Sequence, residues 1–220
     1  MESFLPLGDV AVLSYRADEA AAWRFAAAIR QENAPWLVDV VQAYTSVAIF
    51  FDLDKVHYAD VVRWLRRLAS EPTQSEVLPK VAFHQIPCCY EFQLDLGRIA
   101  EHTGLPAGEI IRLHSETEYT IYAIGFCPGF PYLGYLPPAL SGVPRLAEPR
   151  VRVEAGSVGL TGRQTGIYTE VRPGGWNLLG RTPLQLVDVA DGYFPLHTGD
   201  RVRFERIDEA RFRQLLGERL

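Results

Sequence analysis

Apolar and polar positions follow two different periods in the first 70 residues. Residues 10–15 are apolar in the manner of a strand, whereas residues 18–30 are rich in alanine and repeat their apolar positions at helical spacing. Asp18 stands at the start of this second run and is expected to cap a helix. The chain therefore opens with a strand followed by a helix.

Two more strands and a second helix are predicted next. Residues 37–51 are rich in β-branched and aromatic side chains, and the run is interrupted near Gln42 and Ala43. In residues 58–69 four apolar side chains share one helical face. They are Val61, Val62, Leu65 and Leu68. The order β-α-β-β-α predicts a small ferredoxin-like α/β layer.

The pattern changes after residues 71–79, a polar segment with two prolines that is predicted to be a linker. We expect an N-terminal α/β domain over residues 1–78 and a second domain over residues 79–220. In the second domain short apolar runs are separated by glycine and proline, which favours a closed or nearly closed β-barrel. The expected elements are strands at 81–92 and 119–126, helices at 94–102 and 107–113, and an outer helix at 208–216. The fold class is α+β.

Charge and targeting signals narrow the function. The chain carries 27 acidic and 22 basic residues, a net charge of −5, and no basic run longer than Arg66-Arg67, which disfavours nucleic acid. No apolar stretch approaches the roughly 20 residues of a membrane span, and no signal peptide is evident. Three cysteines indicate no disulfide framework. We expect a cytoplasmic protein that contacts neither membrane nor nucleic acid.

The segment over residues 125–134 is the most informative one for binding. Two prolines fix its backbone, glycines expose it, and three aromatic rings accompany them, so the loop can form a rigid wall for a ligand. The alternative is a buried turn whose rings fill the mouth of the barrel. The candidate ligand-binding residues are Phe126, Pro128, Gly129, Phe130, Pro131 and Tyr132.

Two further segments are candidates for polar recognition. Residues 155–168 carry a glycine every three or four positions, which permits close approach of backbone N–H groups to an anionic or carbonyl ligand. The alternative is a set of tight barrel corners. Side-chain hydrogen bonds are expected from Gln164, Thr165 and Tyr168.

The other segment, residues 172–183, places Trp176 after Gly174 and Gly175 and adds Arg181 five residues later. A guanidinium there can clamp a carboxylate with two hydrogen bonds. Alternatively, Arg181 pairs with Asp188 and serves packing only.

Nucleophile and metal chemistry are less favoured. Cys127 with His114 as base is one arrangement, but a free cysteine is more often an apolar filler. His84 with Cys88 and Cys89 resembles half of a metal site without a second ligand pair, so no metal is expected. His114, just before a predicted strand, is the histidine we include among the ligand-binding candidates. No catalytic residue is assigned.

Several ordered motifs together resemble one family. They are residues 119–134 (YTIYAIGFCPGFPYLG), Pro144-Arg-Leu, Pro149-Arg, 155–159 (AGSVG), 164–168 (QTGIY), 173–176 (PGGW) and 180–183 (GRTP). They resemble the KipI/PxpB family, also labelled allophanate hydrolase subunit 1, and one half of the carboxyltransferase region of urea carboxylases. The resemblance is strong over residues 80 to 205. Glu154 and Tyr135 stand where the family usually has proline and glycine, and Tyr135 is expected to change the dimensions of a ligand site beside it.

The resemblance implies a cyclophilin-like barrel in the second domain and a role as the B-type component of an ATP-dependent 5-oxoprolinase that converts 5-oxoproline to glutamate. It implies two partners, a C-type component of 5-oxoprolinase (allophanate hydrolase subunit 2-like) and an A-type component. Neither Lys55 nor Lys80 lies in a phosphate-binding loop, so ATP is expected to bind at an interface or on a partner. The alternative role within the family is an inhibitor that binds a sensor histidine kinase.

Overall fold

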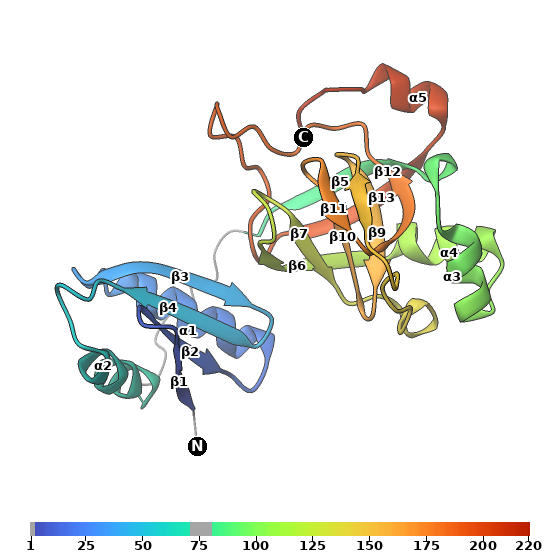
Figure 1. Cartoon of the computed structure of the whole chain (residues 1–220). Helices are drawn as coiled ribbons and strands as arrows, with labels where there is room; N and C mark the ends of the chain where they lie inside the picture. Colours follow the sequence, from blue (N-terminus) through green and yellow to red (C-terminus); the bar gives the residue numbers. More distant parts are fainter. Residues whose placement is uncertain (1–2, 71–80) are drawn as a thin grey trace. The chain divides into compact units, whose positions relative to one another are not determined.

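The chain folds into two units, Met1–Lys80 and Val81–Leu220. The structure is a computed structural model that describes residues 3–70 and 81–220 (Figure 1). The predicted linker at residues 71–79 lies outside the described residues. Each unit has a hydrophobic core of its own.

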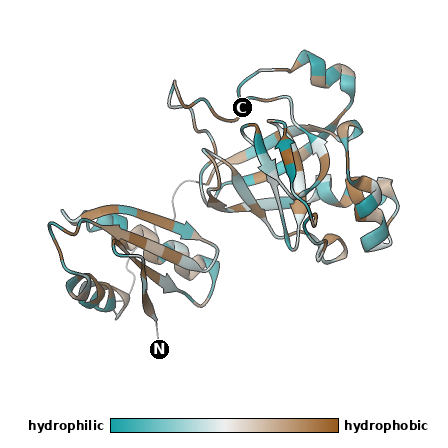
Figure 2. Cartoon of the chain, in the orientation of Figure 1, coloured by the Kyte–Doolittle hydropathy of each residue, from teal (hydrophilic) through white to brown (hydrophobic). Residues whose placement is uncertain are grey.

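The N-terminal unit is a four-stranded antiparallel sheet with the order β1-β2-β4-β3. The bounds are β1 (Phe4–Leu7), β2 (Ala11–Tyr15), α1 (Glu19–Gln31), β3 (Leu37–Ala43), β4 (Ser46–Phe51) and α2 (Tyr58–Ser70). Both helices pack on one face of the sheet, because Phe25 and Ile29 of α1 and Leu65 of α2 join Ile49 of β4 in one core. Figure 2 shows these strands as largely hydrophobic and α2 as largely hydrophilic on its outside.

Most predicted elements of this unit are confirmed. The Oδ1 atom of Asp18 accepts a hydrogen bond from the backbone N–H of Ala21 at 2.7 Å, so Asp18 caps α1. The break in residues 37–51 is the turn between β3 and β4, where Tyr44 has a φ of 53°. The sequence did not predict β1, a short edge strand that contains Pro6. The ferredoxin-like assignment stays a prediction.

The second unit is built around a closed seven-stranded barrel with the order β10-β7-β6-β13-β5-β12-β9. All neighbouring pairs are antiparallel except β13 and β5. The barrel strands are β5 (Phe83–Cys89), β6 (Glu118–Ile124), β7 (Pro131–Gly134), β9 (Ser157–Thr161), β10 (Gln164–Ile167), β12 (Asn177–Arg181) and β13 (Arg201–Ile207). The prediction of a mixed chain with a closed barrel is confirmed, and the barrel agrees with the expected cyclophilin-like type.

Short elements cover the barrel. A two-stranded ribbon pairs β8 (Arg150–Val153) with β11 (Arg172–Gly174), and it lies outside the closed sheet. The helices are α3 (Leu96–Thr103), α4 (Ala107–Glu116) and α5 (Glu209–Gln214), with single turns η1 (Tyr90–Phe92) and η2 (Pro138–Leu140). The predicted final helix is confirmed, with Asp208 as its N-cap. None of the helices in the described residues has the length and hydropathy that crossing a bilayer requires.

Candidate functional site

A chain of hydrogen bonds runs through the buried interior of the barrel unit. The ring of His114 on α4 is fully buried; its Nδ1 lies 2.7 Å from the hydroxyl oxygen of Tyr90, and its Nε2 lies 2.9 Å from Oγ1 of Thr165. Thr165 on β10 in turn donates to the carbonyl oxygen of Gly159 on β9. Thr165 therefore accepts from a protonated Nε2, and Nδ1 accepts from Tyr90. The chain of bonds ties a helix to three parts of the barrel.

The buried position of His114 determines its charge state and its hydrogen-bond partners. Burial lowers the pKa of His114 from 6.5 to about 3, so the ring is neutral at neutral pH. Both ring nitrogens of His114 form hydrogen bonds, and the hydroxyl of Thr165 forms two, one with His114 and one with Gly159. In this structure His114 and Thr165 hold the core together, and their ligand-binding role stays a prediction. His114 lies in the last turn of α4, which extends past the predicted end at residue 113 and directly precedes β6.

The predicted aromatic residues, which are far apart in sequence, come together at one end of the barrel. The ring centroids of Phe130 and Tyr168 are 5.3 Å apart, and those of Phe130 and Trp176 are 5.5 Å apart, both edge to face. Tyr132 packs at 4.9 Å from Phe130 and 5.8 Å from Trp176. We call Phe126, Phe130, Tyr132, Tyr168 and Trp176 the aromatic cluster.

Most of the aromatic cluster is packed rather than open. Phe130, Tyr168 and Trp176 are at most 5% exposed, which favours the alternative in which the rings fill the barrel mouth. Phe126 differs, because it is 59% exposed and has a φ of 69°. The loop thus exposes the ring of Phe126 to solvent, whereas the other rings beneath it are packed together.

Close backbone contacts fix the loop that carries Phe126 and Phe130. Gly129 has a φ of 67°, and a Cβ atom there would lie 2.2 Å from Cγ2 of Val187. Thr169 donates from Oγ1 to the carbonyl oxygen of Pro128 at 2.7 Å, and the Sγ atom of Cys127 lies 3.5 Å from the same hydroxyl. Thr169 was not among the predicted site residues, and its only signal in the sequence is its place after the 164–168 motif.

Tyr168 joins the aromatic cluster to the glycine turn. A Cβ atom added to Gly174 would lie 2.2 Å from the hydroxyl oxygen of Tyr168, so only glycine leaves room for that hydroxyl. At Gly175 the nearest atoms would be 3.6 Å away, in Pro149. Gly174, Gly175 and Trp176 therefore form a turn, here called the glycine turn, whose backbone lies against Tyr168.

A groove of about 340 Å³ runs beside this cluster. Tyr168 and Arg181 both line it, so the structure brings these two predicted residues together. The other lining residues are Ala155, Gly156, Thr169, Thr182, Pro183, Leu184, Gln185, Leu186, Val187, Leu216 and Gly217. We call this the Arg181 groove.

The backbone of Gly156 forms part of the wall of the Arg181 groove. Its N–H donates to the carbonyl oxygen of Tyr168 at 2.7 Å, and its own carbonyl accepts from the N–H of Thr182 at 2.9 Å. Its φ is 82°, and a Cβ atom would lie 2.3 Å from the carbonyl oxygen of Thr182. The glycine-rich segment therefore serves as a tight corner here, because this N–H already has a backbone partner.

Arg181 is oriented by one hydrogen bond and keeps its terminal nitrogens available. Its Nε donates to the carbonyl oxygen of Ala155 at 2.9 Å. Among residues 3–70 and 81–220, no hydrogen bond or ion pair engages its two Nη atoms. Arg181 also lines a second groove of about 410 Å³, where Glu91, Arg152 and Glu154 supply further charges.

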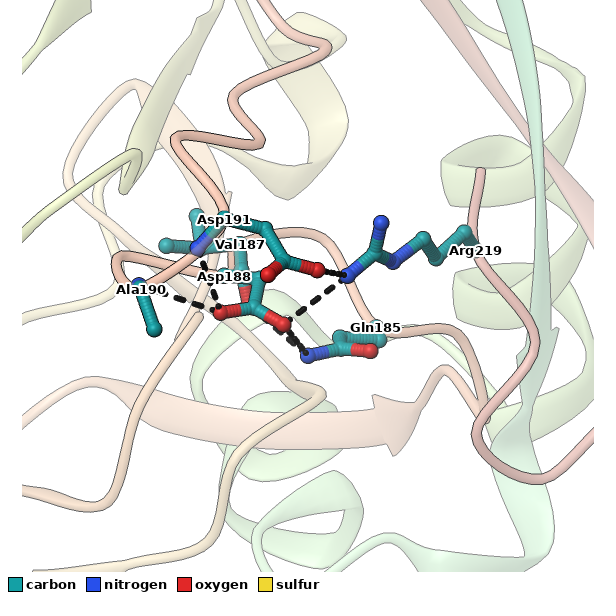
Figure 3. Close-up of polar contacts among 6 residues, drawn as sticks. All are labelled: Gln185, Val187, Asp188, Ala190, Asp191 and Arg219. Atoms are coloured by element: carbon teal, nitrogen blue, oxygen red, sulfur yellow. Dashed lines mark hydrogen bonds and ion pairs between the residues drawn. The ribbon is translucent and has the colours of Figure 1, made fainter.

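The alternative pairing of Arg181 with Asp188 is wrong. Figure 3 shows that the carboxylate of Asp188 faces Arg219, at 2.9 Å, and Gln185. Arg219 also bonds Asp191. The other oxygen of Asp188 accepts the backbone N–H groups of Ala190 and Asp191, so the carboxylate is satisfied without Arg181.

The remaining predicted residues lie outside the Arg181 groove. Gln164 is half-buried on β10, opposite Gly134 of β7, and Pro131 is buried at the start of β7. Pro128 is exposed and contributes its carbonyl to the Thr169 contact. None of these three side chains lines the groove.

The structure does not support the nucleophile arrangement. Cys127 belongs to the packed cluster beneath the loop, whereas His114 bonds Tyr90 and Thr165, so the two do not form a pair. His84 bonds Asp200 at 3.0 Å, and Cys88 and Cys89 lie buried along β5. In the parts of the chain that the structure describes, no three His, Cys, Asp or Glu side chains gather as metal ligands would.

Comparison with known proteins relates these motifs to one group of proteins. A family model described as the carboxyltransferase domain, subdomain C and D, matches residues 3–194. The chain is 39% identical over 191 residues to a protein of Escherichia coli O157:H7 that is named as the B subunit of 5-oxoprolinase, covering 86% of this chain and 85% of that protein.

Two solved structures are similar. TTHA0988 is 33% identical with a TM-score of 0.74 over 94% of this chain, which spans only 40% of that longer chain. The urea carboxylase of Kluyveromyces lactis is 18% identical with a TM-score of 0.81 over 98% of this chain and 22% of its own. At that identity the likeness shows the fold alone.

The buried His114 makes stability depend on pH. The unfolded chain binds a proton at this ring below pH 6.5, whereas the folded chain does so only near pH 3. The free energy of unfolding should therefore decrease as pH falls below 6.5. At pH 5 we expect His114 to account for a decrease of about 2 kcal/mol. Urea unfolding of wild type and His114→Gln between pH 8 and pH 5 measures the difference.

His102→Gln, at an exposed histidine of α3, is the matched control and should keep the wild-type pH profile. A His114→Gln profile parallel to wild type over this range would contradict the predicted linkage.

The contact between Tyr168 and Gly174 can be tested with a pair of neighbouring glycines. Gly174→Ala forces the Tyr168 ring to move and should lower the unfolding free energy by about 1–3 kcal/mol, as overpacking does. Gly175→Ala has nothing nearer than 3.6 Å and should be nearly neutral. Equal urea midpoints for the two variants would show that the contact does not constrain the turn.

Proposed function

The chain belongs to the family of carboxyltransferase domains, subdomains C and D, and we propose that it is the B-type component of a hydrolase complex that opens 5-oxoproline to glutamate with ATP. The relative's name indicates a system of several subunits. The proposed partners are an A-type component and a C-type component of the same complex. The chain alone is expected to be inactive.

Opening 5-oxoproline is difficult because resonance stabilises its lactam. In the proposed reaction ATP transfers its γ-phosphoryl group to the lactam oxygen, which makes the ring carbon electrophilic. Water adds to that carbon and the C–N bond breaks, so the nitrogen leaves as the amine of glutamate. A second water releases phosphate, and the products are glutamate, ADP and phosphate. The role left for a binding component is to hold the small anionic substrate in position.

The observation that carries the proposal is the Arg181 groove. A groove of about 340 Å³ suits a small ring compound, and it combines an apolar wall from Leu186 and Val187 with the guanidinium of Arg181. Because Nε is bound to Ala155, the two Nη atoms have a fixed orientation and are available to a carboxylate. We infer that Arg181 binds the carboxylate of 5-oxoproline, which leaves the lactam free to react.

ATP does not fit the residues of this chain as its principal binder. Lys55, one of two lysines, pairs with Asp52 in the N-terminal unit, and Lys80 lies outside the described residues. The corner at Gly156 uses its N–H within the protein and so cannot donate it to phosphate. We therefore propose that ATP binds mainly on a partner protein. No role as a kinase inhibitor is proposed, because no feature of the grooves favours it.

The proposal predicts the behaviour of Arg181 variants in the reconstituted complex. Glutamate release from 5-oxoproline and ATP is measured with the chain alone and with both partner proteins. Arg181→Ala should lower kcat/KM by about 10- to 100-fold, since a hydrogen-bonded ion pair is lost. Arg181→Lys should recover part of the loss, because it keeps the charge without the planar fork.

Arg203→Ala, at an exposed arginine of β13, is the control and should retain wild-type activity. If Arg181→Ala leaves the activity of the complex unchanged, Arg181 does not bind the substrate. No glutamate with any combination of the three proteins would overturn the proposed reaction.

A further inference from the structure

Arginine and tyrosine side chains that can donate further hydrogen bonds gather around the glycine turn, apart from Arg181. Two arginines flank this turn. Arg150 of β8 is paired in register with Gly174 of β11, and Arg145 directly precedes Leu146, whose N–H donates to the carbonyl oxygen of Gly175 at 2.8 Å. The backbone thus brings both arginines to the turn that touches Tyr168.

Only one of the two terminal nitrogens of Arg150 bonds its carboxylate partner. Its Nη2 donates to Oδ1 of Asp95 at 2.7 Å, and the other oxygen of Asp95 accepts the N–H of Leu178 at 2.7 Å. The Nη1 atom of Arg150 is buried and has no hydrogen-bond partner within the described residues. An unsatisfied buried donor costs free energy, which a bound acceptor would recover.

Arg145 adds a second positive charge that nothing in the described chain neutralises. It is exposed and forms no hydrogen bond or ion pair with residues 3–70 or 81–220, and the same is true of Glu148 in its loop. Asp95, at 7% exposure, is therefore the one carboxylate in contact with this pair of arginines in the described structure. One positive charge remains uncompensated.

Two tyrosine hydroxyls face the same region. The hydroxyl of Tyr168 lies against Gly174, and Tyr132 packs its ring on Trp176 while its hydroxyl bonds no other described residue. Burial raises the pKa of both tyrosines, and the positive charge of Arg145 opposes the rise in both. Arg150 opposes it in Tyr168 as well. Both phenols stay protonated at neutral pH and can donate.

We propose that Arg145, Nη1 of Arg150 and the hydroxyls of Tyr132 and Tyr168 form a binding site for a small oxyanion, a carboxylate or a phosphate. Guanidinium and phenol groups are all donors, and an oxyanion is the ligand class that satisfies them together. This site is distinct from the Arg181 groove, and Tyr168 lies between the two.

The site is tested by binding to the full chain alone, without partners or turnover, so its outcome is independent of the proposed hydrolase reaction. Trp176 is the single tryptophan of the barrel unit, since Trp23, Trp36 and Trp64 belong to the N-terminal unit. Its fluorescence is followed while 5-oxoproline, inorganic phosphate or 2-pyrrolidinone, the same lactam without a carboxylate, is added.

We expect a saturable response to 5-oxoproline, to phosphate or to both, and none to 2-pyrrolidinone. A response to 5-oxoproline alone identifies the carboxylate as the ligand, and a response to phosphate alone identifies a phosphoryl group. Arg145→Gln should weaken the Kd at least tenfold. Arg203→Gln, which removes the same charge from exposed β13, should leave the Kd unchanged and so exclude a general charge effect.

Tyr132→Phe provides a second variant that removes one hydroxyl and keeps the ring packed, and it should also weaken binding. Equal Kd values in wild type, Arg145→Gln and Tyr132→Phe would overturn the proposal. So would the absence of any saturable response to both anions, or an equal response to 2-pyrrolidinone.

Discussion

The hydroxyl of Tyr168 resting on Gly174 is the contact on which the barrel mouth depends. The ring of Tyr168 packs against Phe130 of the aromatic cluster, and its backbone carbonyl accepts a hydrogen bond from the N–H of Gly156. Tyr168 also lines the Arg181 groove. Three motifs that are separated in sequence therefore meet at this one residue. A Cβ atom at residue 174 would occupy the place of that hydroxyl, so the glycine is a steric requirement rather than a source of flexibility.

The interior of the barrel and its mouth use polar groups in opposite ways. Inside, Tyr90, His114 and Thr165 satisfy one another, as buried polar groups must. At the mouth, Arg181 keeps two nitrogens available, and Arg150 keeps one, because each has a single firm anchor. The satisfied chain of bonds gives rigidity, and the unsatisfied donors are the groups that we propose bind a ligand. On this proposal, each arginine is held in position by one hydrogen bond and keeps other donors for a ligand.

Local signals in the sequence predicted what depends on local physics. The Asp18 cap, the helical face of α2 and the frequent turns of the barrel follow from spacing and residue type. The inward direction of His114 and the partner of Asp188 did not, because both depend on residues tens of positions away. The family motifs identified the barrel mouth but not the roles within it. Arg145 and Arg150 each follow a proline in the sequence. Their common position beside the glycine turn could not be predicted, because it depends on the pairing of β8 with β11.

The central proposal is that the barrel mouth of this chain binds the substrate in the assembled complex. Hydrogen–deuterium exchange of the complex with both partner proteins, with and without 5-oxoproline, tests this directly. Substrate binding at the mouth predicts slower exchange at residues 145–156 and 168–187 when 5-oxoproline is present, and unchanged exchange at residues 3–70. Protection confined to the partners, with no change at the barrel mouth, would contradict it.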